Sequence, residues 1–440
     1  MNKLFQISFV SFILIANYMV GQQKLSLNDA VKITLENNLD IKIVENQDEI
    51  FKNNASFLNS GYLPTISSNA GINKSEQNIE IETPNNLSGK LDNMKSENSF
   101  SNISLNYILL DNSGRNFNYK KSKELSNRSK LEVKEVIENS LLQLFTVYYE
   151  VCRLFEEREI IKSSLEISKT RLERKNTEFE FGQSTKLEVL NAEVDVNTDS
   201  IKLLSSIQNL SNAKRDLNLI MNVELNSNYD LDRNVIYNSK DKISEFYKNA
   251  AENNTRLKIY DKSVDISSYE LKSIKSTYLP TIGLVGSYDW NESINDNPYA
   301  FFNKNIYDGI SGGINLSWNI FNSGKRITAN KNAKIKLENS KIEKEKVFLI
   351  FQKELNNAYE TYINNLFILE VQEKSLLTSE NNFLRNLEKY NIGIVSSIEF
   401  RRAQINLLNA KLSRNTAMYD GKLSELYFLK VAGAIIGSSF

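Results

Sequence analysis

Two long stretches of the chain contain neither proline nor glycine, and they constrain the fold more than any other feature. They run from Asn116 to about Phe179 and from Lys325 to about Tyr390. Inside the first stretch, apolar residues recur in alternating steps of four and three, the heptad pattern of packed helices: Ile137, Leu141, Leu144, Tyr148, Val151 and Phe155. About 60 residues of helix span on the order of 90 Å, more than the width of a globular domain. The sequence therefore predicts helices that extend well beyond one compact core.

Each long stretch is followed by a glycine, Gly182 or Gly393, and then by a second helical pattern. In the later copy a set of apolar residues keeps the seven-residue register: Ile398, Ile405, Leu408, Leu412, Tyr419, Leu426 and Leu429. Arg401, Asn415 and Lys422 interrupt this pattern with polar side chains. We therefore expect each glycine to form the turn of a long antiparallel helical hairpin.

Three motifs occur twice in the same order, which indicates an internal duplication. Tyr62–Ile66 and Tyr278–Ile282 both read Tyr-Leu-Pro-Thr-Ile, at an offset of 216 residues. "LNYILLDNSGR" resembles "LSWNIFNSGKR" at an offset of 210 between the glycines, and "FGQSTKLEVLNAE" matches "IGIVSSIEFRRAQ" at 211. We expect a first structural repeat at residues 22–240 and a second at 241–440. Each repeat would contain a helix, a β-hairpin and a long helical hairpin.

The start of each repeat is predicted to be helical, from Ser26 to about Asn59 and from Ile243 to about Ser276. Ser26 and Asp29 have the spacing of a capping box, in which the two side chains satisfy free backbone N–H groups. Proline disfavours helix in the residue before it and suits the first position of a strand. Pro64 and Pro280 therefore predict a switch from helix to strand.

After each proline step the apolar period becomes two, which is typical of β-strands. Three segments show it clearly: Ile282, Leu284, Tyr288 and Trp290; Ile314, Leu316, Trp318 and Ile320; and Ile103, Leu105, Tyr107 and Leu109. We expect two strands of about ten residues in each repeat. Long polar loops, Asn73–Asn98 and Asn291–Asp308, would join them.

Strands of this length, apolar on one face and rich in Asn and Ser on the other, fit a membrane-spanning barrel with a wet interior. A half-buried hairpin of a soluble protein is the alternative. Four strands are too few to close a barrel, and an open sheet edge is not tolerated in lipid. If the sheet lies in a membrane, several copies of the chain must complete it.

The N-terminus has the pattern of a secretory signal peptide at residues 1–21. Lys3 precedes an apolar run, and the chain becomes polar at Gly21. A membrane anchor is the alternative, which polar residues such as Gln6 and Asn17 within the run disfavour. No cysteine follows the break, so a lipid on the new N-terminus is not expected. The mature protein is predicted to be exported.

The composition argues against an enzyme and against a nucleic-acid-binding protein. The chain has no histidine and one cysteine, Cys152, so histidine-based catalysis, disulfides and thiolate metal clusters are not expected. The numbers of basic and acidic residues are equal, at 54 each, and a nucleic-acid binder should show a basic excess. We expect no catalytic residue, no cofactor and no bound metal. Cys152 lies in an apolar helical pattern and should be buried.

The ordered combination of these features resembles the TolC family of outer-membrane efflux proteins. The residues that carry the resemblance are the two Tyr-Leu-Pro-Thr-Ile steps, the "SWNIFNSGK" segment from Ser317 to Lys325, and both glycine turns. The resemblance implies a mainly α fold with a small β part and four strands per chain. It further implies a homotrimer that forms one α/β-barrel channel, located in the outer membrane and reaching into the periplasm.

The same resemblance implies passive conduction and a set of partners. An inner-membrane pump of the RND, ABC or MFS class would supply the energy, a periplasmic adaptor would connect pump and channel, and outer-membrane lipid would surround the strands. Two rival hypotheses remain open. The chain could be an exported coiled-coil scaffold or interaction protein without a pore, or a secreted enzyme, for which no catalytic pair is found.

The resemblance also places candidate functional residues at the periplasmic tip, around Gly182 and Gly393. Glu188 and Glu399 align with carboxylates that narrow the entrance of the family's channels, and Tyr390 aligns with a gate tyrosine. The chain departs from the family pattern twice: Val395 stands where a gate arginine is expected, and Arg402 where a second acid is expected. The alternative for Glu188 and Glu399 is that they are solvated acids that stabilise a helix N-terminus.

Overall fold

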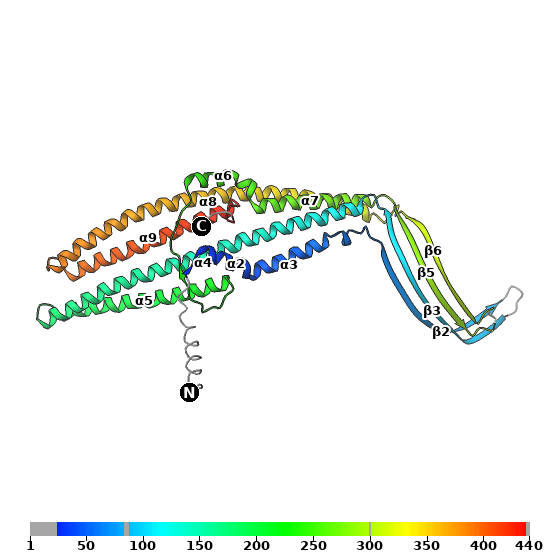
Figure 1. The fold of residues 1–440 in the computed structure, drawn as a ribbon, viewed down its shortest axis with the longest axis horizontal. Helices are drawn as coiled ribbons and strands as arrows, with labels where there is room; N and C mark the ends of the chain where they lie inside the picture. The colour runs from blue at the N-terminus through cyan, green and yellow to red at the C-terminus, as the bar shows by residue number, and fades with distance from the viewer. Residues whose placement is uncertain (1–23, 83–87, 299–300, 437–440) are drawn as a thin grey trace, which may run out of the picture. The chain divides into compact units, whose positions relative to one another are not determined.

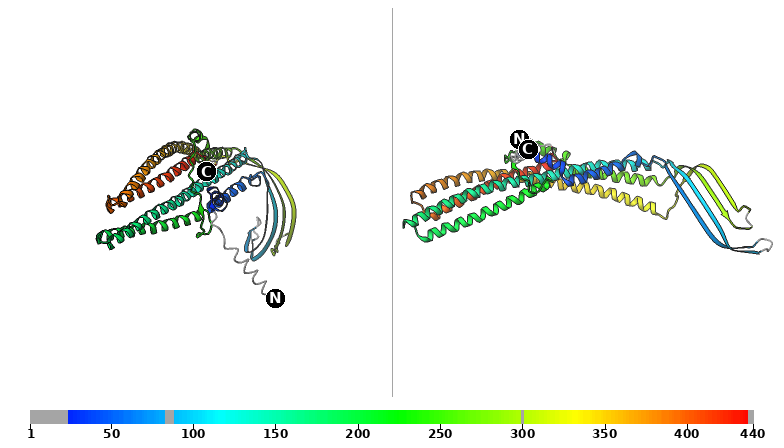
Figure 2. Two further views of the ribbon diagram at one scale, coloured as in Figure 1. Left: turned by 60° about the vertical axis from the view of Figure 1, so that its left-hand side comes forward. Right: turned by 60° about the horizontal axis from the view of Figure 1, so that its bottom comes forward.

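The computed structural model describes residues 24–82, 88–298 and 301–436, and the predicted signal peptide lies outside these residues. The chain divides into two compact units (Figures 1 and 2). The first unit contains residues 1–46, 131–258 and 346–440, and the second contains 47–130 and 259–345. Both units therefore combine segments from the two halves of the sequence.

The four long helices have the lengths that the breaker-free stretches predict. They are α4 (Gly114–Glu180), α5 (Lys186–Ile220), α8 (Lys325–Asn391) and α9 (Ser397–Val431). Within the first unit, α4 runs beside α5 to form a first hairpin, and α8 runs beside α9 to form a second (Figures 1 and 2). The predicted helical hairpins are confirmed. Among the described residues, no helix is long and apolar enough to cross a membrane.

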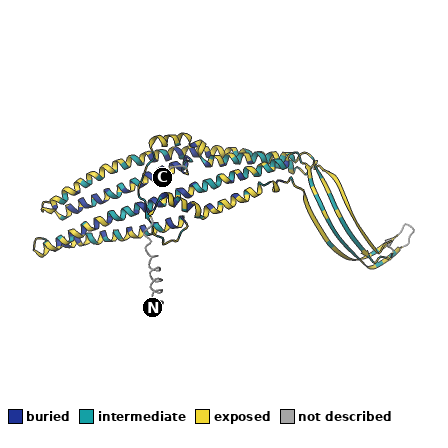
Figure 3. Ribbon diagram, viewed as in Figure 1, coloured by how far each residue is buried: buried dark blue, intermediate teal, exposed yellow. Residues whose placement is uncertain are grey.

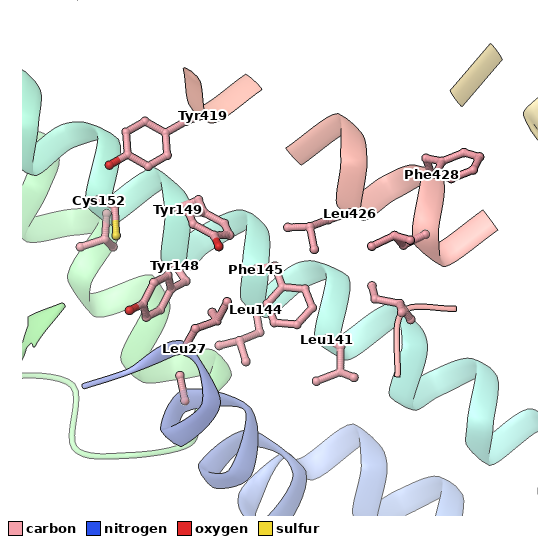
Figure 4. Packing of buried hydrophobic residues seen from close by; sticks show 14 of the residues in the cluster. Leu27, Leu141, Leu144, Phe145, Tyr148, Tyr149, Cys152, Tyr419, Leu426 and Phe428 are labelled. Atoms are coloured by element: carbon pink, nitrogen blue, oxygen red, sulfur yellow. The ribbon is translucent and has the colours of Figure 1, made fainter. Parts of the chain in front are cut away.

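The core of the first unit is built on the heptad pattern of α4 (Figure 4). The predicted heptad register is confirmed, because four of its residues are buried there and pack with Leu426 and Phe428 of α9: Leu141, Leu144, Tyr148 and Val151. Cys152 is also buried, and burial raises the pKa of its thiol to about 12. The thiol is therefore neutral and unreactive at neutral pH.

The register of α9 is correct over most of its length. Leu408, Tyr419, Leu426 and Leu429 are buried, but Ile398 is 74% exposed because it lies in the first turn of the helix, beside the exposed interhelical turn. The three polar interruptions, Arg401, Asn415 and Lys422, are buried as well. These polar side chains can occupy buried positions of the heptad pattern because each is hydrogen-bonded. The Asn415 amide, for example, donates to the Arg153 carbonyl over 2.9 Å.

The helix expected at the start of each repeat is broken in two, which corrects the prediction. The segments are α2 (Leu27–Asn37), α3 (Leu39–Asn54) and a short 3₁₀ turn (Phe57–Asn59) in one half, and α6 (Lys240–Asn253) and α7 (Thr255–Ser276) in the other. The predicted capping box of Ser26 and Asp29 is present at the start of α2.

An asparagine causes each break. The Asn38 side chain accepts hydrogen bonds from the backbone of Asp40 and Ile41, and Asn254 accepts one from Leu257, so the helix restarts instead of continuing. Both amides also donate to the end of a distant helix: Asn38 to the Ile220 carbonyl over 3.3 Å, and Asn254 to the Val431 carbonyl over 2.8 Å.

The second unit contains an antiparallel sheet in the order β2-β3-β5-β6. Its strands are β2 (Thr65–Glu82), β3 (Ser88–Leu110), β5 (Thr281–Asn295) and β6 (Lys304–Ser317). β2 and β5 begin directly after Pro64 and Pro280, which confirms the predicted switch. A separate parallel pair, β1 (Lys24–Leu25) and β4 (Asp230–Leu231), belongs to the first unit.

The strands are longer than predicted. Most of the expected loop Asn73–Asn98 is paired strand, because its polar side chains pair across the ladder: Lys74 with Glu97 at 2.9 Å and Ser75 with Ser96 at 2.8 Å. The second loop is shortened in the same way, to the residues between Asn295 and Lys304. β6 ends at Ser317, so Trp318 and Ile320 lie outside the strand.

The two faces of this sheet differ in chemistry, and most of its side chains are exposed or half-buried (Figure 3). One transverse row, Ser68–Ile103–Tyr288–Ile310, is exposed, and its three members on β3, β5 and β6 are apolar. The neighbouring row on the opposite face consists of serines: Ser67, Ser104, Ser287 and Ser311. Two pairs of them are hydrogen-bonded at 2.8 Å. One face thus suits an apolar environment and the other suits water.

Candidate functional site: the two hairpin turns

Both hairpin turns have the same backbone geometry. Gly182 and Gly393 adopt φ values of +70° and +76°. In each turn the N–H of the following residue donates to the carbonyl five residues back, Gln183 to Glu178 at 2.7 Å and Ile394 to Lys389 at 2.9 Å. This is the Schellman motif, which favours glycine because other residues are strained at positive φ. A Cβ atom on either glycine would meet nothing within 4 Å, so conformation rather than space selects glycine.

The acidic residue after the second turn closes a local capping box. The Ser396 hydroxyl accepts from the Glu399 N–H at 3.3 Å, and the Glu399 carboxylate accepts from the Ser396 N–H at 3.0 Å. The hydrogen bond from this backbone group lowers the pKa of Glu399. The contacts of Glu399 are therefore those of a helix-start acid.

The corresponding acid of the first turn makes a different set of contacts. Thr185 caps α5 by accepting from the Glu188 N–H, but the Glu188 carboxylate accepts from the Ser184 hydroxyl at 2.6 Å and from the Lys175 ammonium at 3.2 Å. These two hydrogen bonds lower the pKa of Glu188. Glu188 thus links α5 to α4. Whether Glu188 and Glu399 also narrow a channel stays a prediction.

Tyr390, the candidate gate residue, is buried inside the protomer. Its ring is stacked on Phe400, with centroids 4.6 Å apart, and the Arg174 guanidinium lies 4.6 Å from its centroid. Phe383 and Leu407 complete a small apolar cluster. Tyr390 therefore connects α8 with α9 and with α4 of the other hairpin.

The turns also carry apolar side chains that face solvent. Those more than two-thirds exposed are Phe181, Leu187, Ile392, Ile394 and Ile398. Of the two positions that depart from the family pattern, Val395 is half-buried and Arg402 is exposed. An apolar surface of this kind on a pair of neighbouring turns is typical of a protein-binding site.

Behind the turns lies an ion-pair network that sequence reasoning did not find. Arg401 of α9 forms a bidentate pair with Asp199 of α5, at 2.6 and 2.9 Å, and its Nε lies 3.4 Å from Asp195. Asp195 also pairs with Arg171 of α4. The network therefore joins the two hairpins.

Both partners of the central pair are almost fully buried, with Asp199 1% and Arg401 8% exposed. Burial disfavours the charged form of Asp199, but hydrogen bonds from Arg401 and Ser168 outweigh it and lower the pKa of the carboxyl group. The pair is ionised at neutral pH. The available signal in the sequence was Arg401 itself, a charged residue at a core position of the heptad pattern.

The sequence profile of one family, described as outer membrane efflux protein, matches residues 30–223 and 246–433. The chain belongs to this family. A curated relative, the outer membrane protein TolC of Vibrio cholerae, is 21% identical over 299 residues, which are 67% of this chain and 68% of the relative.

Solved structures show the same fold. The outer-membrane channel CmeC of Campylobacter jejuni matches with a TM-score of 0.77 and 17% identity, covering 93% of this chain and 86% of that one. The outer-membrane protein VceC of Vibrio cholerae also gives 0.77, with 11% identity, 92% of this chain and 96% of that one. The predicted fold class, mainly α with a small β part, is confirmed.

Family membership decides between the hypotheses that the sequence left open. The protein is an outer-membrane efflux channel, and it is not an enzyme. The hypothesis of a coiled-coil scaffold without a pore is not supported. The roles assigned to Gly182, Glu188, Tyr390, Gly393, Val395, Glu399 and Arg402 stay predictions.

Proposed function

We propose that three copies of this chain form one channel, each contributing its four strands to a common barrel. The observation that carries this proposal is the sheet order β2-β3-β5-β6, in which β2 and β6 each have one edge without a partner strand among the described residues. A free edge cannot be exposed to lipid, because its N–H and C=O groups would have no hydrogen-bond partners. Pairing of β6 with β2 of the next copy satisfies both edges.

The chemistry of the two faces supports the same arrangement. The row Ile103–Tyr288–Ile310 would meet outer-membrane lipid, and the serine row on the other face would line the water-filled interior. This alternation is the pattern of membrane β-barrels. The interior would offer hydroxyl groups rather than fixed charges along that row, which suits passive conduction.

The test of this proposal is assembly and conduction. The purified full-length protein in detergent should be a trimer by native mass spectrometry, and it should form pores in planar lipid bilayers. A monodisperse soluble monomer in detergent-free buffer would contradict the proposal, because the exposed apolar face of the sheet should cause aggregation in water.

We further propose that the two glycine turns form the periplasmic end of the channel and bind an adaptor. The adaptor would connect the channel to an inner-membrane pump of the RND, ABC or MFS class. Exposed apolar side chains on both turns, such as Phe181 and Ile394, provide the contact surface. Because the turns are held by Schellman motifs, this surface is rigid before binding.

Bulky substitutions at the two glycines can distinguish a loss of adaptor binding from a loss of folding. Gly182→Leu and Gly393→Leu together should abolish efflux in cells while trimer assembly and outer-membrane insertion remain. The matched control is Gly→Ala at both positions, which adds the same positive-φ strain with little bulk and should retain most efflux.

Cross-linking tests the same surface directly. Cysteines at Ser184 or Ser396 should cross-link to the adaptor, and cysteines at Asn73 or Asn291, which lie in the strands, should not. Normal efflux from the double leucine variant without any cross-link at the turns would rule out docking there and leave the channel proposal intact.

A further inference from the structure

The face of the sheet that carries the serine row, which we call the serine face, has one charged residue where all four strands are paired. These paired rows run from that of Thr65 to that of Lys74, and the charged residue is Asp289 of β5. The other residues of the serine face there are serine, threonine, asparagine or glycine, with three exceptions: Phe100, Val285 and Tyr307. Because successive side chains of a strand alternate between faces, the remaining charged residues of these rows belong to the opposite face. They are Lys74, Glu97, Glu292, Lys304 and Asp308.

Side-chain contacts show on which face two of the acids lie. Ser287 belongs to the serine row, and its hydroxyl donates to the Asp289 carboxylate and lies 2.8 Å from the Ser311 hydroxyl. The Asp289 carboxylate is therefore on the serine face. Tyr288 belongs to the neighbouring row of the opposite face, and its hydroxyl donates to the Asp308 carboxylate over 3.3 Å. The Asp308 carboxylate is therefore on the opposite face.

Asp289 is accessible to solvent and has no basic partner. The residue is half-buried, and within the described part of the chain no lysine or arginine forms an ion pair with it. Two acids of the opposite face, by contrast, pair with lysines: Glu97 with Lys74 at 2.9 Å, and Glu292 with Lys304. A carboxylate without a basic partner attracts mobile cations from the surrounding water.

We propose that Asp289 makes the strand-lined part of the channel select for cations, so that positively charged solutes pass more readily than anions. This inference rests on the proposed function, because the assembly of three copies places one such carboxylate per copy around a common interior. Charges on a wall act on ions within a Debye length, which is about 10 Å at 0.1 M salt and about 3 Å at 1 M. The selectivity is therefore expected in dilute salt and should weaken in concentrated salt.

The measurement is the reversal potential of the full-length protein in planar bilayers, with unequal KCl concentrations on the two sides. K⁺ and Cl⁻ have nearly equal mobilities in water, so the potential reports the effect of charge in the pore. With about 0.1 M salt on the dilute side, the ratio of K⁺ to Cl⁻ permeability should fall about twofold in Asp289→Asn and further in Asp289→Lys. Asparagine keeps an oxygen that can accept the hydrogen bond from Ser287.

Asp308→Asn is the matched control, since it removes the same charge from the neighbouring strand on the opposite face. Its permeability ratio should equal that of the wild type. Raising the salt to about 1 M should reduce the difference between the wild type and Asp289→Asn. Native mass spectrometry of each variant checks that the trimer is retained.

The outcomes separate this inference from the channel proposal. A lower ratio in Asp289→Asn that Asp308→Asn does not share supports the assignment of Asp289. Pores with an unchanged ratio in Asp289→Asn, or with an equal change in Asp308→Asn, would overturn the assignment and leave the channel proposal intact. Failure of the wild type to form pores would overturn the channel proposal and this inference with it.

Discussion

The two hairpin turns share one backbone geometry but differ in how their acidic residue is used. Glu399 is bonded within its own capping box, whereas Glu188 reaches across to Lys175 on the neighbouring helix. The same spacing from glycine to acid therefore produces one self-contained turn and one turn that is tied to α4. Equivalent motifs in the two predicted repeats can thus stabilise a single turn in one case and the contact between two helices in the other.

The two hairpins differ more strongly behind the turns, at the positions of the buried ion pair. The glycines are 211 residues apart (393 − 182), and this offset places Ala410 at the position of Asp199 and Leu190 at the position of Arg401. Each hairpin therefore carries one half of the buried ion pair, with an apolar residue at the matching position of the other. The hairpins are complementary rather than interchangeable.

The largest expected effect comes from breaking this complementarity. Asp199→Asn leaves the buried Arg401 guanidinium without its bidentate partner, and should reduce the free energy of unfolding by about 3 to 5 kcal/mol at neutral pH. The measurement is chemical unfolding followed by circular dichroism. Because the pKa of Asp199 is lowered in the folded state, its stabilisation should be present at neutral pH and be lost only as the pH falls below its ordinary value of 3.8.

The control for this prediction makes the two hairpins alike. The double variant Asp199→Ala with Arg401→Leu places the residues of the other hairpin at both positions and removes both buried charges. It should be more stable than either single variant. A double variant with the summed loss of the two single variants would show that the pair does not act as a unit.

A smaller and equal effect is expected at the two glycines. Gly182→Ala and Gly393→Ala each force a side chain into positive φ without any steric contact, and each should reduce the free energy of unfolding by about 1 kcal/mol. Thermal unfolding of the two variants checks this. Clearly unequal losses would mean that the turns do not share one constraint.

The smallest expected losses of stability come from substituting Glu188 and Glu399. Which of the two losses is larger tests the difference between the two turns. Glu188→Gln removes a charge-assisted bond to Lys175 near the surface, so we expect a loss of a few tenths of a kcal/mol. Since the pKa of Glu188 is lowered, this contribution should be present above about pH 4.5 and disappear as the pH falls through the folded-state value.

Glu399→Gln should change stability less, because glutamine keeps the side-chain oxygen that closes a capping box. Unfolding curves of both variants at neutral and acidic pH compare them. A larger and more pH-dependent effect at Glu399 than at Glu188 would reverse the interpretation of the two turns.

Local signals predicted much of this fold, and long-range contacts account for what was missed. The four long helices follow from the absence of breakers and from heptads such as Leu141–Tyr148. The breaks at Asn38 and Asn254 were missed because an asparagine also fits a helical pattern, and one contact that holds the Asn38 side chain in its capping position, with the Ile220 carbonyl, is 182 residues away. The length of the hairpin β2–β3 was missed because its polar tip pairs through cross-strand contacts.

The candidate site shows the same limit. Gly182 and Gly393 were predicted as turns because positive φ is a property of a single residue. The pair of Asp199 and Arg401 spans 202 residues, so no local pattern could join them. Arg401 was recognised only as an interruption of an apolar register, and its partner became visible through the packing of the two hairpins.

The asparagine breaks have an evolutionary consequence. Asn38 holds the end of α5, and Asn254 holds the end of α9, so the beginning and the end of each proposed repeat meet in the same place within the first unit. A segment whose two ends already meet can be copied in tandem with only a short connector, because the second copy starts where the first one finishes. This geometry would have let an ancestral half-length chain double by simple fusion without rebuilding its helices.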